Sequence, residues 1–158
     1  MKSFDSTSGE QTWITPRWIV ESLGHFDLDP CAADVMPYAT ADRMVTKEEN
    51  GLSVDWGCDR VWLNPPYGRD MPAFLEKMHN GVALLPSRTD NAWFHELVLP
   101  KCSGIYFVRG RIKFISKDGS DSGTPAFASM LVPYSVEDKE AILNSGIRGN
   151  MVIPGRIS

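Results

Sequence analysis

The sequence has no long apolar run, few cysteines and no excess of positive charge. No stretch approaches the ~20 consecutive apolar residues that a membrane-spanning helix needs, so we expect no membrane partner. The three cysteines are odd in number and far apart, which fits neither a disulfide framework nor a zinc site, and the three histidines are scattered as well. The polar N-terminus lacks the apolar core of a secretory signal. We therefore predict a cytoplasmic protein without a metal.

Charge and length narrow the class further. The net charge of −4 at pH 7 gives no global reason to expect nucleic acid, so any such binding would need a local basic patch. A chain of 158 residues fits a single domain with its own core. We expect a flexible arm over residues 1–11 and one domain over 12–158.

Short apolar runs alternate with helical spacing along the chain. Strands are expected over 26–29 (stopping at Pro30), 44–46, 61–63, 82–85, 105–108 with a continuation to 115, and 126–132. Helices are expected from Pro16 to Gly24, over 71–80, over 90–99 and after Ser135. This alternation predicts an open, mostly parallel α/β sheet with antiparallel C-terminal strands. Ligands of such sheets bind beyond the carboxyl ends of the strands, so the ends at Asp29 and Asn64 are expected to face one crevice.

The run Asn64-Pro65-Pro66-Tyr67 follows the apolar segment 61–63 directly. Composition alone explains a pair of prolines, but an Asn before it and an aromatic residue after it lower the expectation to roughly 0.3% for the whole chain. An amino group on a base ring is a poor nucleophile because its lone pair is delocalised. The Asn64 side-chain oxygen and the Pro65 carbonyl could accept its two N–H groups and return electron density to nitrogen.

Tyr67 offers a flat face on which a base taken out of its helix could stack, worth about 1–3 kcal/mol. The motif contains no titratable base, which suits a reaction in which nitrogen attacks first and loses its proton later. The bland alternative for Asn64 is a polar turn residue.

Asn64-Pro65-Pro66-Tyr67 resembles the catalytic motif of S-adenosylmethionine-dependent amino-methyltransferases, which includes some RNA guanine and protein glutamine enzymes. Further stretches are similar to the compact phage-type (Dam-like) DNA N6-adenine methyltransferases, in the expected order. They are Trp13–Pro16, Phe26–Ala32, Gly51-Leu52 with Trp56, Leu84–Asp90 with Trp93-Phe94, and Gly110–Phe114.

This resemblance implies a Rossmann-like class I methyltransferase fold, S-adenosylmethionine as cofactor, adenine N6 of DNA as target, and the cytoplasm of a bacterial or phage-infected host cell. It implies catalytic roles for Asn64, Pro65, Pro66 and Tyr67. The cofactor residues that it implies are Thr15, Pro16, Asp29, Pro30, Cys31, Ala32 and Asp55. Two departures stand out. The loop after the first strand has no glycine, and no acidic residue can be placed where the family usually binds the cofactor ribose, Glu48 and Glu49 being weak candidates.

Several of these residues could instead have purely structural roles. Asp29 could cap a turn before Pro30, and Asp55 could equally be a turn residue. The Thr15 hydroxyl could cap the helix that follows it. Trp13 and Trp56 fit core or edge packing better than ligand contacts.

The stretch from Arg109 to Lys117 is the one basic segment of an acidic chain. If it is extended, Arg109, Arg111 and Lys113 share one face, which could contact DNA phosphates together with Arg88. A solvated strand edge is the bland alternative. The same alternation places Phe114 on the opposite face, in the core rather than on a base.

Two other functions stay open. One is the same amino-methyl transfer to RNA or to a protein amide, and the other is a non-catalytic regulator that binds cofactor or DNA. The sequence does not reveal a recognition site. Because little room is left for a separate recognition domain, specificity is either loose or requires a second copy, so a homodimer is a further possibility.

Overall fold

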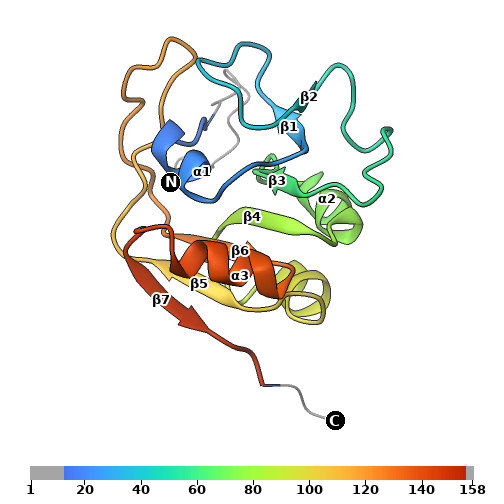
Figure 1. Ribbon diagram of the computed structural model, residues 1–158, viewed down its shortest axis with the longest axis vertical. Coiled ribbons are helices and arrows are strands. Elements are labelled where there is room, and N and C mark those ends of the chain that lie inside the picture. Colours follow the sequence, from blue (N-terminus) through green and yellow to red (C-terminus); the bar gives the residue numbers. More distant parts are fainter. Residues whose placement is uncertain (1–12, 156–158) are drawn as a thin grey trace, which may run out of the picture.

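The computed structural model describes residues 13–155, so the arm expected over 1–11 lies outside the described residues. One sheet runs through the molecule in the strand order β2-β1-β3-β4-β6-β5-β7 (Figure 1). Its strands are β1 Leu28–Ala32, β2 Arg43–Thr46, β3 Val61–Leu63, β4 Gly81–Pro86, β5 Ile105–Val108, β6 Ser129–Pro133 and β7 Gly149–Val152. The helices are α1 Arg17–Ser22, α2 Met71–Lys77, the π-helix η1 Phe94–Val98 and α3 Val136–Leu143.

The sheet is parallel where the chain begins and antiparallel where it ends. β1 pairs in parallel with β2 and β3, and β3 pairs in parallel with β4. β6 is antiparallel to both β4 and β5, and β7 is antiparallel to β5. The chain passes from β1 to β2 on one side and then returns to β3 on the other, so the strand order reverses between β1 and β3. The prediction of an α/β sheet with antiparallel C-terminal strands is confirmed.

The first strand corrects one expectation. β1 continues through Pro30 to Ala32 instead of stopping at the proline. Its pairing with β2 is irregular between Asp29 and Ala32, and it pairs with β3 at Leu28, opposite Val61. No regular ladder bond is therefore needed from the nitrogen of Pro30, and this is how a proline is tolerated inside the strand.

Two strands of the C-terminal half differ from the sequence-based prediction. β5 ends at Val108 instead of continuing to Ile115, because the chain turns at Gly110, whose φ is +80°. β7 has no counterpart in the sequence-based prediction. Its residues, Gly149–Val152, include Gly and Asn, which have low strand propensity, so it forms through its partner β5 rather than through local preference.

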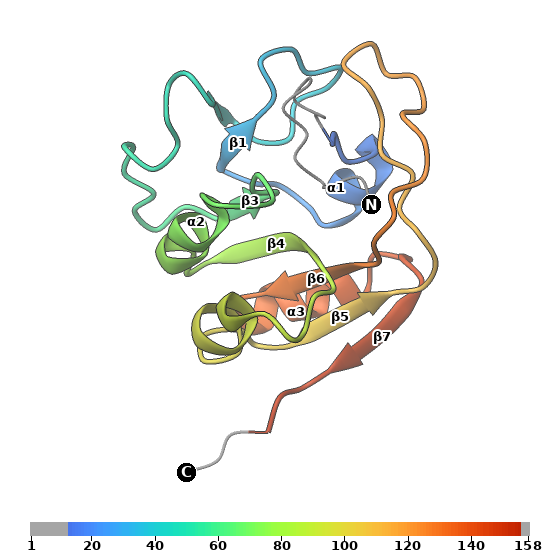
Figure 2. The same cartoon turned by 180° about the vertical axis from the view of Figure 1, so that it is seen from behind.

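Both faces of the sheet are covered by helices (Figures 1 and 2). α1 and α3 pack on one face through Ile19 and Ile142, together with Phe114. α2 and η1 pack on the other face, where Phe74 and Phe94 join the core. Among the described residues, no helix is long and apolar enough to cross a membrane.

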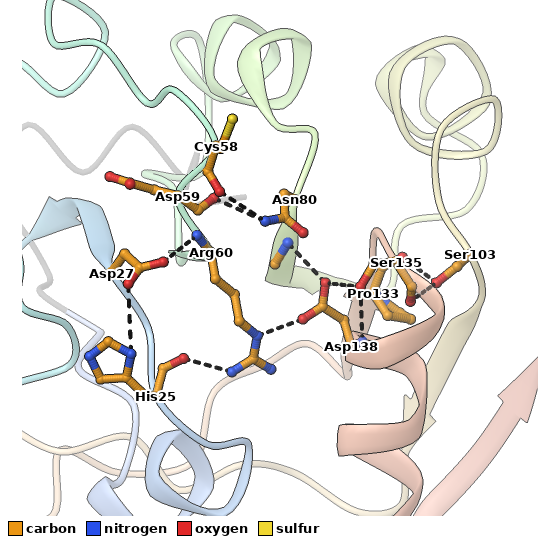
Figure 3. A network of polar contacts seen from close by, with 11 residues as sticks. His25, Asp27, Cys58, Asp59, Arg60, Asn80, Ser103, Pro133, Ser135 and Asp138 are labelled. Carbon is orange, nitrogen blue, oxygen red and sulfur yellow. Dashed lines mark hydrogen bonds and ion pairs between the residues drawn. The ribbon is translucent and has the colours of Figure 1, made fainter.

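A buried ion pair joins the starts of three elements (Figure 3). The Asp138 carboxylate accepts hydrogen bonds from Arg60 Nε at 2.6 Å, the Gly81 amide at 3.0 Å and the Ser135 hydroxyl at 2.6 Å. Ser135 Oγ in turn accepts from the Asp138 amide and caps α3, as expected for a helix that begins there. The Arg60 guanidinium also lies 4.3 Å over the Phe26 ring. Every charge in this cluster therefore has partners.

Replacing Asp138 with alanine should lower the free energy of unfolding by about 3–5 kcal/mol, because the Arg60 charge and the Gly81 amide would lose their partner. Urea unfolding followed by circular dichroism measures the loss. The matched control is Glu137→Ala, next to it on α3 but exposed, which should change stability little. Equal effects of the two substitutions would contradict the role given to Asp138.

Candidate active site

The two oddest strand ends lie on neighbouring strands. β1 and β3 are parallel partners, so Ala32 and Leu63 end at the same edge of the sheet. The order of strands reverses between them, and in open α/β sheets ligands bind at such a reversal, beyond the carboxyl ends. The structure therefore brings the Asp29 segment and the Asn64 motif to one edge, as the sequence predicted.

Asp29 is buried inside β1 with 3% of its surface exposed. Its Oδ1 accepts a hydrogen bond from the Cys31 amide at 3.0 Å, and its Oδ2 accepts one from the Thr40 hydroxyl at 2.5 Å. Burial raises the pKa of this carboxyl from 3.8 to about 6, and the two hydrogen bonds oppose that rise. The bond from the Cys31 amide is the contact expected if Asp29 only caps a turn. Thr40 lies in a stretch for which the sequence predicts no helix or strand.

The segment after Asp29 is closely packed. Pro30 and Ala32 are buried and Cys31 is half-buried, with its thiol pKa raised well above the usual range by burial. A Cβ on Gly51 would lie 1.9 Å from the Pro30 carbonyl oxygen, so only glycine allows this approach. Gly51, one of the residues that carry the family resemblance, therefore has a structural role: it allows the backbone of its turn to pack against that of Pro30.

Thr15 does not cap α1. The N-cap of that helix is Pro16, without a side-chain cap, and the helix begins at Arg17. The Thr15 hydroxyl is buried and has no partner among the described residues, while the Thr15 carbonyl accepts a hydrogen bond from Tyr38. A buried hydroxyl without a partner costs free energy, so this group is available to a ligand.

The Asn64 side chain is oriented by a backbone group from the N-terminal segment. Its Nδ2 donates to the Trp13 carbonyl at 2.8 Å. A carbonyl can only accept, so this bond fixes which end of the amide is nitrogen and leaves Oδ1 pointing elsewhere. None of the described residues donates a hydrogen bond to Asn64 Oδ1 or to the Pro65 carbonyl. Two acceptors of one motif thus remain available.

Tyr67 belongs to an aromatic cluster at the same edge. Its ring lies 5.2 Å from that of Phe127 at an interplanar angle of 82°. Phe127 also contacts Trp13 at 6.0 Å, and Trp13 contacts Phe114 at 5.4 Å. The Tyr67 hydroxyl is buried without a partner among the described residues, and burial raises its pKa above the usual range. Phe114 is fully buried, which confirms its place in the core.

Two other residues have structural roles. The Asp55 carboxylate accepts from the Gly57 amide at 2.8 Å, and the Asp55 carbonyl accepts from Arg43, the first residue of β2. Among the described residues, these contacts do not link Asp55 with Asp29, and they support a role for Asp55 as a turn residue. Trp56 is a core residue, as expected, and donates to the Gly51 carbonyl. Pro16 is half-buried and Pro66 is exposed.

The acidic candidates for the cofactor ribose follow the carboxyl end of β2. Both Glu48 and Glu49 are exposed. Glu49 Oε1 accepts hydrogen bonds from the amide and the hydroxyl of Thr46, and these bonds lower the pKa of Glu49. Thr46 pairs with Ala32 of β1, so this turn lies beside the segment that follows Asp29.

The basic residues lie on the surface, but one of them also supports a loop. Arg88, Arg109, Arg111 and Lys113 are all exposed, whereas Ile112 is buried, so the predicted alternation of faces is present. The segment is irregular rather than a strand. Arg111 Nη1 donates to the Pro125 carbonyl at 3.0 Å, a contact that the sequence did not reveal.

His25, Asp27 and Asp42 place their ligand atoms within 4.8 Å of one another, near the amino ends of β1 and β2. They are exposed or half-buried, each carboxylate pairs with His25, and the contact with Asp42 raises the pKa of His25. The expectation of a protein without a metal stays a prediction.

The strand reversal, the buried carboxylate and the two acceptors without a donor among the described residues together define an α/β protein with candidate ligand-binding groups at the carboxyl ends of its strands. The DNA N-6-adenine-methyltransferase (Dam) family matches residues 2–146. The DNA N-6-adenine-methyltransferase of Haemophilus phage HP1 (strain HP1c1) is 30% identical over 147 residues, which cover 84% of this chain and 83% of the relative. No solved structure matches the chain significantly.

The chain therefore belongs to the DNA N-6-adenine-methyltransferase family. The predicted activity, adenine-specific methylation of DNA, is confirmed at the level of the family. The family also implies S-adenosylmethionine as methyl donor and DNA as substrate.

Replacing Asp29 with asparagine should remove a pH dependence of stability. The pKa of Asp29 is raised in the fold, so its contribution to stability is complete below about pH 4 and is lost as pH rises through about 6. This rise in the pKa of Asp29 corresponds to a change of roughly 3 kcal/mol in the free energy of unfolding. The free energy of unfolding of Asp29→Asn minus that of the wild type, measured in urea, should therefore rise between pH 4 and 7. A constant difference across that range would contradict the raised pKa.

Proposed function

We propose that the chain transfers a methyl group from S-adenosylmethionine to N6 of adenine in DNA, in the crevice beyond the carboxyl ends of β1 and β3. The observation that carries this proposal is the Asn64 amide, whose orientation is fixed by Trp13 and whose oxygen receives no hydrogen bond from the described residues. We further propose that the fold is of the Rossmann-like class I methyltransferase kind and that residues 12–158 form one such domain. The reversal of strand order at β1 and β3 supports this.

In this mechanism the target amino group donates one N–H to Asn64 Oδ1 and the other to the Pro65 carbonyl. Both acceptors favour a pyramidal nitrogen, on which the lone pair becomes nucleophilic. Pro65 and Pro66 add no backbone N–H that could compete for these positions. The Trp13 carbonyl preorganises the Asn64 amide, so little reorientation is needed as charge develops on the amino group.

The residues present fit the implied cofactor. A buried carboxylate, a buried hydroxyl that no described residue partners, and small side chains can hold its polar and apolar parts. When bound, S-adenosylmethionine supplies an electrophilic methyl group on a positively charged sulfur. We assign its binding to Thr15, Pro16, Asp29, Pro30, Cys31 and Ala32. Asp55 stays a weaker candidate because its carboxylate is engaged in a turn, and Glu49 is a candidate for the ribose.

Family membership counts against the two alternatives, a substrate of RNA or protein and a non-catalytic regulator. The proposed location is the cytoplasm of a bacterial or phage-infected cell, and a homodimer stays possible. Transfer of a labelled methyl group to DNA, RNA and protein, with identification of the product base, separates these alternatives. Label found on adenine N6 supports the proposal, whereas label found elsewhere, or none, contradicts it.

Asn64→Ala should reduce the single-turnover rate on DNA by about 10²–10³-fold, because one acceptor that acts mainly in the transition state is lost. Cofactor affinity, measured by calorimetry, should stay nearly unchanged. Asn64→Asp keeps an acceptor but loses the N–H that binds the Trp13 carbonyl, so its rate should lie between those of the wild type and the alanine variant. Asn144→Ala, an exposed residue after α3, is the control. A near-normal rate in Asn64→Ala would refute the mechanism.

The double variant Arg109→Gln/Lys113→Gln should weaken binding to all DNA sequences alike. Each neutralised phosphate contributes about 0.9 to the slope of log affinity against log salt, so the slope should flatten by roughly two units. Arg111 is left intact because it donates to the Pro125 carbonyl. Unchanged affinity and slope would mean that these residues only solvate the surface and that Arg69, Arg88 or the N-terminal segment makes the contact.

A further inference from the structure

Arg148 lies at the same edge of the sheet as the candidate site, although it is far from the Asn64 motif in the sequence. β4 and β5 are both antiparallel to β6, so β5 is parallel to β4 and β3, and all three strands end at the edge that carries Asn64. β7 runs the other way and begins at this edge, beside the end of β5 (Figure 2). Arg109 directly follows β5 and Arg148 directly precedes β7, so the fold places both arginines on the side of the site.

Arg109 and Arg148 lie directly opposite each other. The ladder between β5 and β7 pairs Val108 with Gly149, and at the next position the Arg109 amide donates to the Arg148 carbonyl at 2.8 Å. Both arginine side chains are exposed. Like charges directly opposite in an antiparallel pair are destabilising. The folded chain therefore keeps two positive charges that repel each other.

No acidic side chain among the described residues compensates this pair. Neither arginine forms an ion pair with them, whereas Arg17, Arg43 and Arg60 each pair with a carboxylate. The chain has 20 acidic residues, yet none of them lies in residues 97–117 or 141–158, the two segments that contain β5 and β7. Two uncompensated charges on an otherwise acidic protein indicate an anionic ligand from outside the chain.

The turn before β7 holds the backbone of Arg148 in place. The carbonyl of Ile147 accepts a hydrogen bond from the Tyr106 hydroxyl. A Cβ on Gly149 would lie 2.2 Å from the Phe107 carbonyl oxygen, so only glycine allows the two strands to approach this closely. Arg148 therefore extends its side chain from a backbone that is fixed on both sides.

We propose that Arg148 binds a backbone phosphate of the substrate DNA, next to the phosphate assigned to Arg109. This inference rests on the proposed function, which makes DNA the substrate. A guanidinium suits the task because its fork of N–H donors matches the oxygens of a phosphate. A bound phosphate also neutralises the repulsion between the two arginines.

The position of β7 determines how far this contact extends along the DNA. β7 is four strand spacings from β3 in the sheet, which is roughly 19 Å. At 3.4 Å per base pair, the contacted phosphate lies about five to six base pairs from the target base. The DNA contact therefore extends beyond the basic segment from Arg109 to Lys117, onto an edge strand that the sequence did not predict.

Arg148→Gln should weaken binding to two duplexes of different sequence alike. The slope of log affinity against log salt should flatten by about 0.9, the contribution of one phosphate. Arg148→Lys keeps the charge and should keep the slope. The matched control is Arg43→Gln, which removes the same charge at the opposite edge of the sheet, where Arg43 pairs with Asp59, and it should leave affinity and slope unchanged. Fluorescence anisotropy over a salt series measures both quantities.

Thermal unfolding of the free protein separates a DNA contact from a structural role. If Arg148 acts on DNA, Arg148→Gln removes only a repulsive contact, so at low salt its thermal midpoint should equal or exceed that of the wild type. Affinity and slope equal to those of the wild type would overturn the contact. A fall in thermal midpoint together with the loss of affinity would also overturn it, since Arg148 would then stabilise the fold.

Failure of this inference differs from failure of the proposed function. If the wild-type protein methylates adenine N6 but Arg148→Gln binds DNA as the wild type does, only the phosphate contact of Arg148 is wrong. If the wild-type protein transfers no methyl group to adenine N6 of any DNA, the proposed function itself fails.

Discussion

The buried carboxylate of Asp138 sets where three elements begin. It binds Arg60 just before β3, the amide of Gly81 at the start of β4 and the Ser135 cap of α3. An unpaired charge in this place would cost several kcal/mol, so these groups must meet for the sheet to be complete. β3 is only three residues long. The position of Asn64, the next residue after it, is therefore determined by an ion pair at the opposite end of the strand.

The two ends of the sheet differ in how well their polar groups are satisfied. At the amino ends, the Asp138 cluster has a partner for each charge. Four of the five buried hydroxyls without partners among the described residues adjoin the other end: those of Thr15, Tyr67, Ser87 and Ser129. Folding tolerates such groups where a bound molecule can complete them. The unsatisfied end is also where the strand order reverses, so topology and hydrogen bonding indicate one location for the site.

The sequence indicated most of what depends on side-chain chemistry and periodicity. The Asn64 motif, the α/β pattern and the burial of Phe114 all follow from residue types and spacing. Trp13 is an example of a contact that the sequence could not predict. Its ring packs as predicted, but its carbonyl orients Asn64, which lies 51 positions away. Every residue has a backbone carbonyl, so residue types do not indicate which one makes such a contact. Thr40 and Phe127 likewise act through contacts made only in the folded chain. β7 was missed because its strand is imposed by β5 rather than by its own residues.

The bond between the Trp13 carbonyl and Asn64 has a practical consequence for handling the protein. The segment that leads into α1 orients Asn64 through the Trp13 carbonyl. An affinity tag or fusion partner joined ahead of this segment would therefore be attached close to the proposed acceptor. The other end of the described chain follows β7, an edge strand separated from β3 by three intervening strands (Figure 1). Attachment there keeps purification handles and surface tethers away from the reacting groups.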